Sequence, residues 1–209
     1  MLVLDYTYMK ERQAENEERG MPILVGCDAS AAKGGTGHIF ARVVPAKGVQ
    51  EYAVQALVAE VALLGHKELI LKSDGEPAIQ ALKEAVKAVR SERIVLERSP
   101  VSESRANGLA ENAIQLVQGQ IRTMKHALES RLQVKITESA CILPWLVMHA
   151  AATMNRYRVG KDGFTAYRRL KGKEFRRPAA EFGETVLYLK PGTAGIDTVS
   201  YTHLRAHET

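Results

Sequence analysis

Three acidic residues lie at positions that favour metal-ion chemistry. Asp5 interrupts an apolar strand sequence, LVLDYTY, where burying an unpaired carboxylate is costly. Asp74 ends a second apolar stretch, LILKSDG, and Glu111 lies in the first turn of a predicted helix, in NGLAENA. Carboxylates that share one point repel each other unless cations lie between them, and Mg²⁺ prefers oxygen ligands. Two such ions would activate the attacking oxygen and stabilise the leaving oxygen of a phosphodiester, so the three acids predict phosphoryl transfer.

Each acid also has a structural interpretation. An Asp followed by Gly, as at Asp74, is common in turns, and a Glu in a first helical turn, as at Glu111, complements the helix dipole. Asp5 has no such explanation unless its strand is at the edge of a sheet. The metal interpretation therefore depends on whether the fold brings the three residues together.

The hydrophobic pattern predicts an α/β fold that can do so. It predicts the element order β-β-β-α-β-α-β-α followed by further helices, which gives a mixed five-stranded sheet of three antiparallel strands and then βαβ crossovers, flanked by helices. The first and fourth strands are then parallel neighbours, so Asp5 and Asp74 emerge side by side, and the long helix can bring Glu111 to them. The predicted strands are 2–8, 21–28, 38–45, 68–74 and 93–97, and the helices are 52–64, 76–90, 109–132, 139–156 and 165–170.

The composition excludes several classes of protein. The sequence contains no apolar run of the roughly 18 residues that a membrane span needs, and no signal peptide is recognisable. Its two cysteines, Cys27 and Cys141, lie far apart, which argues against a disulfide framework or a zinc site. We therefore expect an intracellular protein of the nucleus or cytoplasm rather than a secreted one.

A basic cluster follows the predicted core. The chain has a net charge of +5, and the segment 156–177 contains nine Lys or Arg residues against two acids, Asp162 and Glu174. Such a cluster suits a polyphosphate partner, although a solvated helix face is an equally good explanation of a charge run.

Four segments in order resemble the catalytic core of retroviral and retrotransposon integrases, a ribonuclease-H-like fold with a DDE carboxylate triad. VLDYTYM resembles its first strand, and PILVGCDASAAKGGTGHIFARVVPAKG resembles its second and third strands. LILKSDGEP resembles the fourth strand, and SPVSESRANGLAENAIQLVQGQIRT resembles the loop and helix that carry the glutamate. The spacing from Asp74 to Glu111, 111 − 74 = 37 positions, is close to that of integrases. KDGFTAYRRLKGKEFRRP is similar to the region that follows the core in retrotransposon Pol polyproteins.

The resemblance implies an enzyme that trims DNA 3′ ends and transfers them to target DNA. It implies that Asp5, Asp74 and Glu111 hold two Mg²⁺ or Mn²⁺ ions, that DNA is the partner and that the protein forms a homo-oligomer. Asp28 is an alternative first aspartate, because its spacing to Asp74 (74 − 28 = 46) is nearer the integrase value than that of Asp5 (74 − 5 = 69). Topology favours Asp5, since the catalytic aspartate belongs to the first strand. The predicted DNA-binding residues are Arg105, Asn107, Arg122, Lys125, Arg168 and Arg169.

The predicted organisation is an integrase core at 1–160, a basic extension at 161–190 and a disordered or non-native tail at 191–209. Two alternatives remain open. One is an inactive Pol fragment that only binds DNA or dimerises. The other is a ribonuclease-H-type nuclease, for which Glu60 would have to supply an acid from the first helix, although it lies near the end of that helix.

Overall fold

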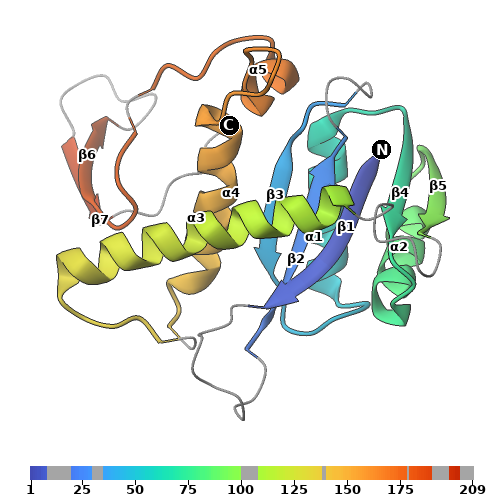
Figure 1. Ribbon diagram of the computed structural model, residues 1–209, viewed down its shortest axis with the longest axis horizontal. Helices are drawn as coiled ribbons and strands as arrows, with labels where there is room; N and C mark the ends of the chain where they lie inside the picture. Colours follow the sequence, from blue (N-terminus) through green and yellow to red (C-terminus); the bar gives the residue numbers. More distant parts are fainter. Residues whose placement is uncertain are drawn as a thin grey trace.

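The protein is built on a five-stranded sheet with the strand order β3-β2-β1-β4-β5 (Figure 1). The computed structural model describes residues 1–8, 20–29, 35–99, 108–137, 140–177, 179–189 and 198–202. Strand β2 is antiparallel to both β1 and β3, whereas β4 is parallel to both β1 and β5. The strands are β1 (Leu2–Tyr8), β2 (Pro22–Asp28), β3 (Ile39–Val43), β4 (Glu68–Ser73) and β5 (Arg93–Arg98).

Helices cover the two faces of this sheet. One face packs on α1 (Glu51–Leu64) and α2 (Pro77–Val89), and its core includes alternate residues of β1 such as Leu2 and Leu4. The other face packs on α3 (Gly108–Leu132) and α4 (Leu143–Tyr157). Since successive side chains of a strand point to opposite faces, the odd-numbered residues of β1 face α3.

Several helices begin or end at residues whose backbone or side-chain properties favour a helix terminus. Pro77 starts α2, where its missing N–H would have no partner within the helix. Gly65 ends α1 with φ of 67°, a conformation that glycine adopts without steric cost. Thr165 caps the short helix α5 (Ala166–Lys171) by accepting a hydrogen bond from the backbone N–H of Arg168.

Helix α4 is fixed to the edge of the sheet by a buried amide. The side chain of Asn155 accepts from the backbone N–H of Ile39 (2.9 Å) and donates to its carbonyl oxygen (2.7 Å). These two bonds satisfy the backbone N–H and carbonyl of Ile39 at the outer edge of β3, as a neighbouring strand would. No local sequence pattern indicates this role.

The predicted mixed sheet with flanking helices is confirmed. A further two-stranded sheet, β6 (Thr185–Leu189) and β7 (Thr198–Thr202), was not predicted, and β7 lies within the segment 191–209 expected to be disordered or non-native. Phe182, in the predicted extension, is buried in the core shared by α3 and α4. None of the described helices is both long and apolar enough to cross a membrane.

Candidate active site

Asp5 lies on β1, and Asp74 directly follows β4, the parallel neighbour of β1, at the point where the two strands separate. The ladder pairs Leu2 with Leu71 and Val3 with Lys72. Two residues further along both chains, the same register brings Asp5 opposite Asp74. Their charges interact, because the Asp74 carboxylate is among the groups that raise the pKa of Asp5. The sheet topology therefore produces the carboxylate pair that the sequence predicted.

Asp5 is held in an environment that disfavours its charge. Burial is the largest cause, and with the negative charges of Asp74 and Glu76 it raises the pKa of Asp5 from 3.8 to about 6. The backbone N–H of Tyr6, which donates to Asp5 Oδ1 at 2.7 Å, and the ammonium of Lys47 act in the opposite direction. Excess negative charge in a half-buried site favours the arrival of a cation.

Lys47 and Glu76 are neighbours of this pair that the sequence analysis missed. The Lys47 ammonium lies 2.7 Å from Glu76 Oε1 and over the rings of Tyr6 and Tyr8, at 5.3 and 5.4 Å from their centroids. Burial lowers the pKa of Lys47, but the hydrogen bond to Glu76 and the charges of Glu76, Tyr8 and Asp5 together outweigh that effect, so that the pKa is raised overall. The ion pair is neutral overall, and its Glu76 carboxylate raises the pKa of Asp5 more than its Lys47 ammonium lowers it. The spacing of Glu76, two residues after Asp74, could have indicated from the sequence that it lies near the site. No sequence pattern indicates that Lys47 does.

The turn that carries Asp74 is tied to helix α2. The Gln80 side chain donates to Ser73 Oγ (3.0 Å) and to the backbone carbonyl of Asp74, and Asp74 Oδ1 accepts from the backbone N–H of Glu76 (3.2 Å). The fully buried Lys83, also on α2, donates to the backbone carbonyl of Glu97 at 2.7 Å. Burial lowers the pKa of Lys83, and the Asp74 charge opposes that change. These contacts fix the position of the Asp74 backbone.

Glu111 is not brought into contact with the pair. It lies in the first turn of α3 and its side chain is exposed. The N-terminal part of α3 crosses β1 (Figure 1), and two turns after Glu111 the Gln118 side chain donates to Thr7 Oγ1 at 2.6 Å. Among the described residues, no three His, Cys, Asp or Glu side chains are close enough to hold a metal ion. The predicted triad is therefore present as a pair, with Glu111 on the helix that covers the same face.

Asp28 has a different environment from Asp5. It is fully buried at the end of β2 and accepts hydrogen bonds from the backbone N–H (2.7 Å) and hydroxyl (2.9 Å) of Thr36, while His66 Nε2 lies 3.2 Å away. It pairs with Leu2 on the side of β1 away from β4, three residues or about 10 Å along the strand from Asp5. Asp28 thus closes the β2–β3 connection and is remote from Asp74.

Two of the predicted DNA-binding residues lie on α3. Arg122 is exposed, whereas Lys125 is buried along the helix with its ammonium 3.8 Å from Glu129. Only Arg122 of these two presents its charge to solvent. Arg105 and Asn107 lie outside the described residues.

The other two predicted DNA-binding residues lie on α5 and differ in availability. Arg168 lies over the ring of Phe164, 4.0 Å from its centroid, and donates to Glu174 at 2.8 Å. Arg169 donates to Asp162, to the carbonyl of Phe164 and to the carbonyl of Thr36, the last two bonds being 2.8 and 2.9 Å long. Arg169 therefore connects the segment after α4 to the β2–β3 connection, which is a structural role.

Glu60 does not belong to the carboxylate pair. It is buried on α1, where Oε1 accepts from the Arg42 guanidinium at 2.6 Å and Oε2 lies 3.5 Å from His38 Nε2. Burial raises the pKa of Glu60, but the hydrogen bonds and charges of His38 and Arg42 together outweigh that effect and lower the pKa. An internal ion pair accounts for this residue, which removes the acid that a ribonuclease H site would have drawn from α1.

Comparison with solved structures identifies the fold. The chain is similar to the catalytic core domain of BIV integrase, with a TM-score of 0.52 and 17% identity, over 82% of this chain and 93% of that domain. It is similar to the magnesium complex of the HTLV-2 integrase catalytic core domain in its dimeric form, with a TM-score of 0.54 and 17% identity, over 81% and 94%.

A larger assembly also contains a similar chain. It is the intasome of simian T-cell lymphotropic virus in complex with the PP2A regulatory subunit B56 gamma, with a TM-score of 0.58 and 16% identity, over 93% of this chain and 64% of that one. Neither a protein-family model nor a curated protein matches the sequence. The chain therefore has the ribonuclease-H-like fold of retroviral integrase catalytic core domains.

Proposed function

We propose that this chain is the catalytic core of a retrotransposon integrase, encoded within a Pol polyprotein, that processes DNA 3′ ends and transfers them to target DNA. The observation that carries the proposal is the Asp5–Asp74 pair on adjacent parallel strands. The similarity to integrase cores supports it at the level of the fold. The proposed organisation is a core at 1–160, a basic extension at 161–190 and a tail at 191–209.

In this proposal Asp5, Asp74 and Glu111 hold two Mg²⁺ or Mn²⁺ ions. The donor set fits hard cations, since carboxylate oxygens at a site with excess negative charge are the ligands such ions prefer. When bound, the ions activate the attacking oxygen and stabilise the leaving oxygen. Glu111 would supply a third carboxylate from the first turn of α3, because two aspartates alone would leave the positive charge of two such ions undercompensated. The fit is supported by the raised pKa of Asp5, which loses a proton more readily when a cation is beside it.

The remaining residues of the site orient this pair. The Tyr6 N–H fixes one oxygen of Asp5, and Gln80 holds the backbone of Asp74. The Lys47–Glu76 ion pair lies beside the pair and is neutral overall. The partner is DNA, whose phosphates we assign to Arg105, Asn107 and Arg122. A homo-oligomer in the nucleus or cytoplasm completes the proposal.

A second candidate function is favoured by the position of Glu111. Because no described group of three acids, histidines or cysteines is assembled, the chain could be an inactive fragment that binds DNA or dimerises without catalysis. The two candidates differ in their response to metal. Only the enzyme uses the Asp5–Asp74 pair.

A disintegration assay tests the enzymatic proposal, because reversal of strand transfer needs only a branched DNA and the core. We would compare wild type with Asp5→Asn, Asp28→Asn and Asp74→Asn in Mn²⁺. Resolution of the branch by wild type, lost in Asp5→Asn and Asp74→Asn, supports the proposal. Activity that survives Asp5→Asn but not Asp28→Asn assigns the first aspartate to β2, provided that melting curves show Asp28→Asn to be folded.

Thermal melting with and without Mn²⁺ distinguishes a chain that binds metal but lacks activity from a chain in which the metal site has been assigned to the wrong residues. Wild type should be stabilised by millimolar Mn²⁺ and Asp74→Asn should not, because the substitution removes one ligand charge. An equal response of the two proteins contradicts the metal site. Stabilisation without branch resolution supports the inactive fragment.

A further inference from the structure

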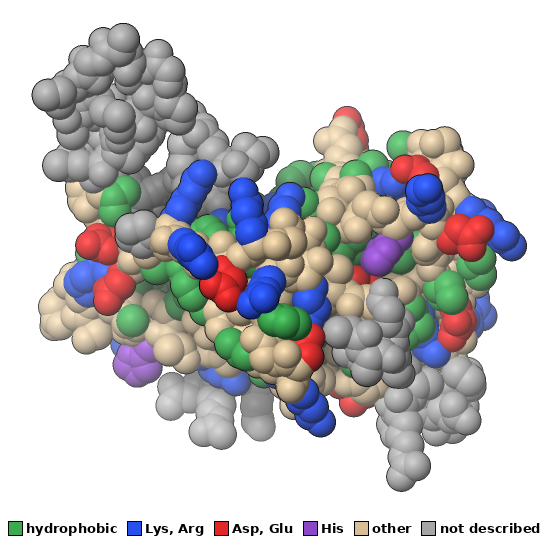
Figure 2. Space-filling model, turned by 90° about the horizontal axis from the view of Figure 1, so that it is seen from above, with side chains coloured by type: hydrophobic (Ala, Val, Ile, Leu, Met, Phe, Trp, Pro, Cys, Tyr) green, Lys and Arg blue, Asp and Glu red, His purple; other side chains and the backbone are tan. Residues whose placement is uncertain are grey.

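The segment 156–177 forms a basic surface on an aromatic base, which we call the arginine–aromatic platform. Its nine Lys and Arg residues and two acids give a net charge of +7, whereas the whole chain carries +5, so the rest of the protein is net negative. In Figure 2 the Lys and Arg side chains gather on the face that includes this segment. A charge excess confined to one face is the electrostatic footprint of a polyanion partner.

Aromatic rings hold the platform's arginines in place. The Arg156 guanidinium lies 4.6 Å from the centroid of Phe175, and the Phe175 ring is contacted edge-on by Tyr157 and Tyr167 at 5.7 and 5.3 Å. Arg168 is stacked in the same way on Phe164. A guanidinium fixed against a ring loses little conformational freedom when it binds, which suits it to phosphate.

The platform's own acids are already neutralised. Asp162 is paired with Arg169, and Glu174 is paired with Arg168 at 2.8 Å and with Arg176 at 3.7 Å. The Arg169 pairing depends on Gly160, where a Cβ would lie 2.2 Å from the Arg169 guanidinium. Further charges on the surface are exposed, namely those of Arg158, Lys161, Lys171, Lys173 and Arg177.

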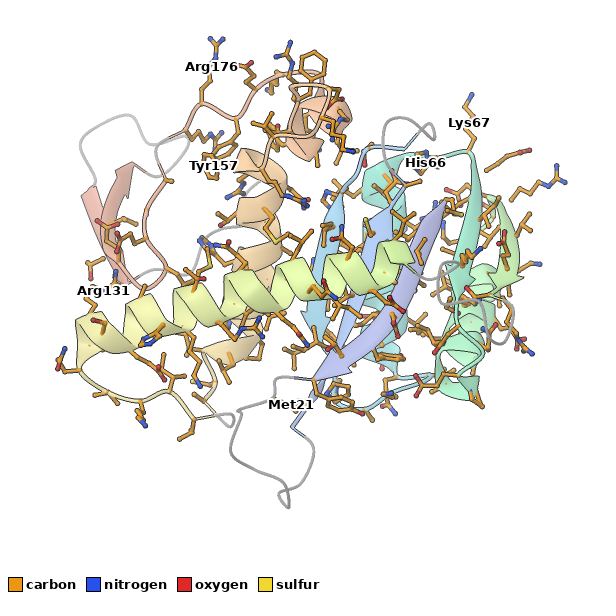
Figure 3. The ribbon with its side chains drawn as sticks, in the orientation of Figure 1. Met21, His66, Lys67, Arg131, Tyr157 and Arg176 are labelled. Atoms are coloured by element: carbon orange, nitrogen blue, oxygen red, sulfur yellow. The ribbon has the colours of Figure 1, made fainter. Side chains whose placement is uncertain are left out.

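The platform lies at the opposite end of the strands from Asp74. Figure 3 shows Tyr157 and Arg176 at the same end of the molecule as His66 and Lys67, which precede β4. Strand β4 runs away from that end for six residues, about 20 Å, before it reaches Asp74. Arg169 fixes the platform there through Thr36, beside the end of β2. A phosphate on the platform is therefore at least about one strand length from the carboxylate pair.

We propose that the arginine–aromatic platform is a second DNA-binding surface, which holds a duplex by its phosphates, without metal and apart from the DNA at the Asp5–Asp74 pair. DNA binding at the Asp5–Asp74 pair rests on the proposed function. DNA binding by the platform does not depend on it. The ligand is the phosphate backbone rather than the bases, because the exposed groups of the platform are mainly cationic and an arginine already covers one face of each of the Phe164 and Phe175 rings. Arg169 is a positioning residue of this surface, since its donors are used within the protein.

Fluorescence anisotropy with a short labelled DNA duplex in EDTA, at several salt concentrations, tests the proposal. The platform variant is Lys171→Gln, Lys173→Gln, Arg177→Gln. The matched control, Lys87→Gln, Arg93→Gln, Lys135→Gln, removes the same charge from exposed residues elsewhere. We expect the platform variant to bind at least about ten-fold more weakly than wild type, with the slope of log K against log salt reduced by about 0.9 for each phosphate that the variant no longer neutralises. The control should bind like wild type.

Three outcomes would overturn the proposal: no binding by wild type in EDTA, equal losses of affinity in the two variants, or no loss in the platform variant. Melting curves confirm that both variants are folded, and their substitutions lie at exposed positions. Asp74→Asn should bind the duplex in EDTA as wild type does. The binding assay in EDTA and the branch-resolution assay are independent of each other. If wild type binds the duplex in EDTA but does not resolve the branch, the proposed catalytic function is contradicted and the platform proposal is not.

Discussion

Replacing Asp5 by Asn should stabilise the metal-free protein at neutral pH, although it removes a residue of the proposed active site. Burial and the neighbouring acids raise the pKa of Asp5 from 3.8 to about 6. Each unit is worth about 1.36 kcal/mol, so two units give an upper limit near 3 kcal/mol. Because the side chain is only half-buried and solvent screens its charge, we expect a gain of about 1–2 kcal/mol. An amide oxygen at the same position can still accept from the Tyr6 N–H.

The gain must depend on pH with a defined sign. A carboxyl with a raised pKa binds more protons in the folded than in the unfolded state, so its contribution to stability is greatest below the unfolded value of 3.8 and is lost as pH rises through about 6. Wild type and Asp5→Asn should therefore melt at similar temperatures near pH 4. At pH 8 the variant should melt about 2–8 °C higher, since 1 kcal/mol shifts the Tm of a protein of this size by about 2–4 °C.

Thermal melting followed by circular dichroism in EDTA, at intervals between pH 4 and pH 8, measures this difference. Other titrating groups are common to both proteins and cancel in the comparison. Asp28→Asn is the contrasting variant, because Asp28 is fully buried and accepts two hydrogen bonds from Thr36, so that the same substitution should lower Tm at pH 8. A lower Tm for Asp5→Asn at pH 8, or a difference that does not change with pH, would refute the reasoning.

Three further substitutions test the packing around the site, each by chemical denaturation. Asn155→Ala should cost about 2–4 kcal/mol of unfolding free energy, because it leaves the backbone N–H and carbonyl of Ile39 without their partners; a cost under 1 kcal/mol would show that water replaces the amide. Gly26→Ala should cost about 1–3 kcal/mol, since its Cβ would lie 2.1 Å from the Phe40 ring, and an unchanged midpoint would contradict this contact. Glu60→Ala should cost about 2–4 kcal/mol by leaving a guanidinium uncompensated, whereas Glu60→Gln should cost less.

The sheet was predictable because its strands are short apolar runs separated by clear turn and helix signals. The order of those runs leaves few topologies, and βαβ crossovers are almost always right-handed. Adjacency of β1 and β4, and with it the Asp5–Asp74 pair, followed from that order. Strand β7 was missed because the sequence after 190 was taken as foreign to the fold, and its partner β6 was missed because 161–190 was interpreted only as a basic extension.

Other features depended on contacts between distant segments, which no local pattern reveals. Arg169 was predicted to bind DNA, yet its bond to Thr36, 133 positions away, gives it an internal role. Lys125 was also predicted to bind DNA, yet it lies on the buried face of α3. A charged side chain has the same letter whether it faces solvent or an internal partner, so sequence spacing alone does not separate the two.

The sequence by itself determined the α/β fold and the two aspartates of the candidate site, because hydrophobic periodicity sets strand order and strand order sets which residues are neighbours. Tertiary structure decided the environment of each acid. It buried Asp28 against Thr36, paired Glu60 with Arg42, and left Asp5 half-buried beside Asp74 with a raised pKa. The physical reason is that desolvation and Coulomb interaction depend on the distances among groups from several elements, and those distances exist only after the helices have packed on the sheet.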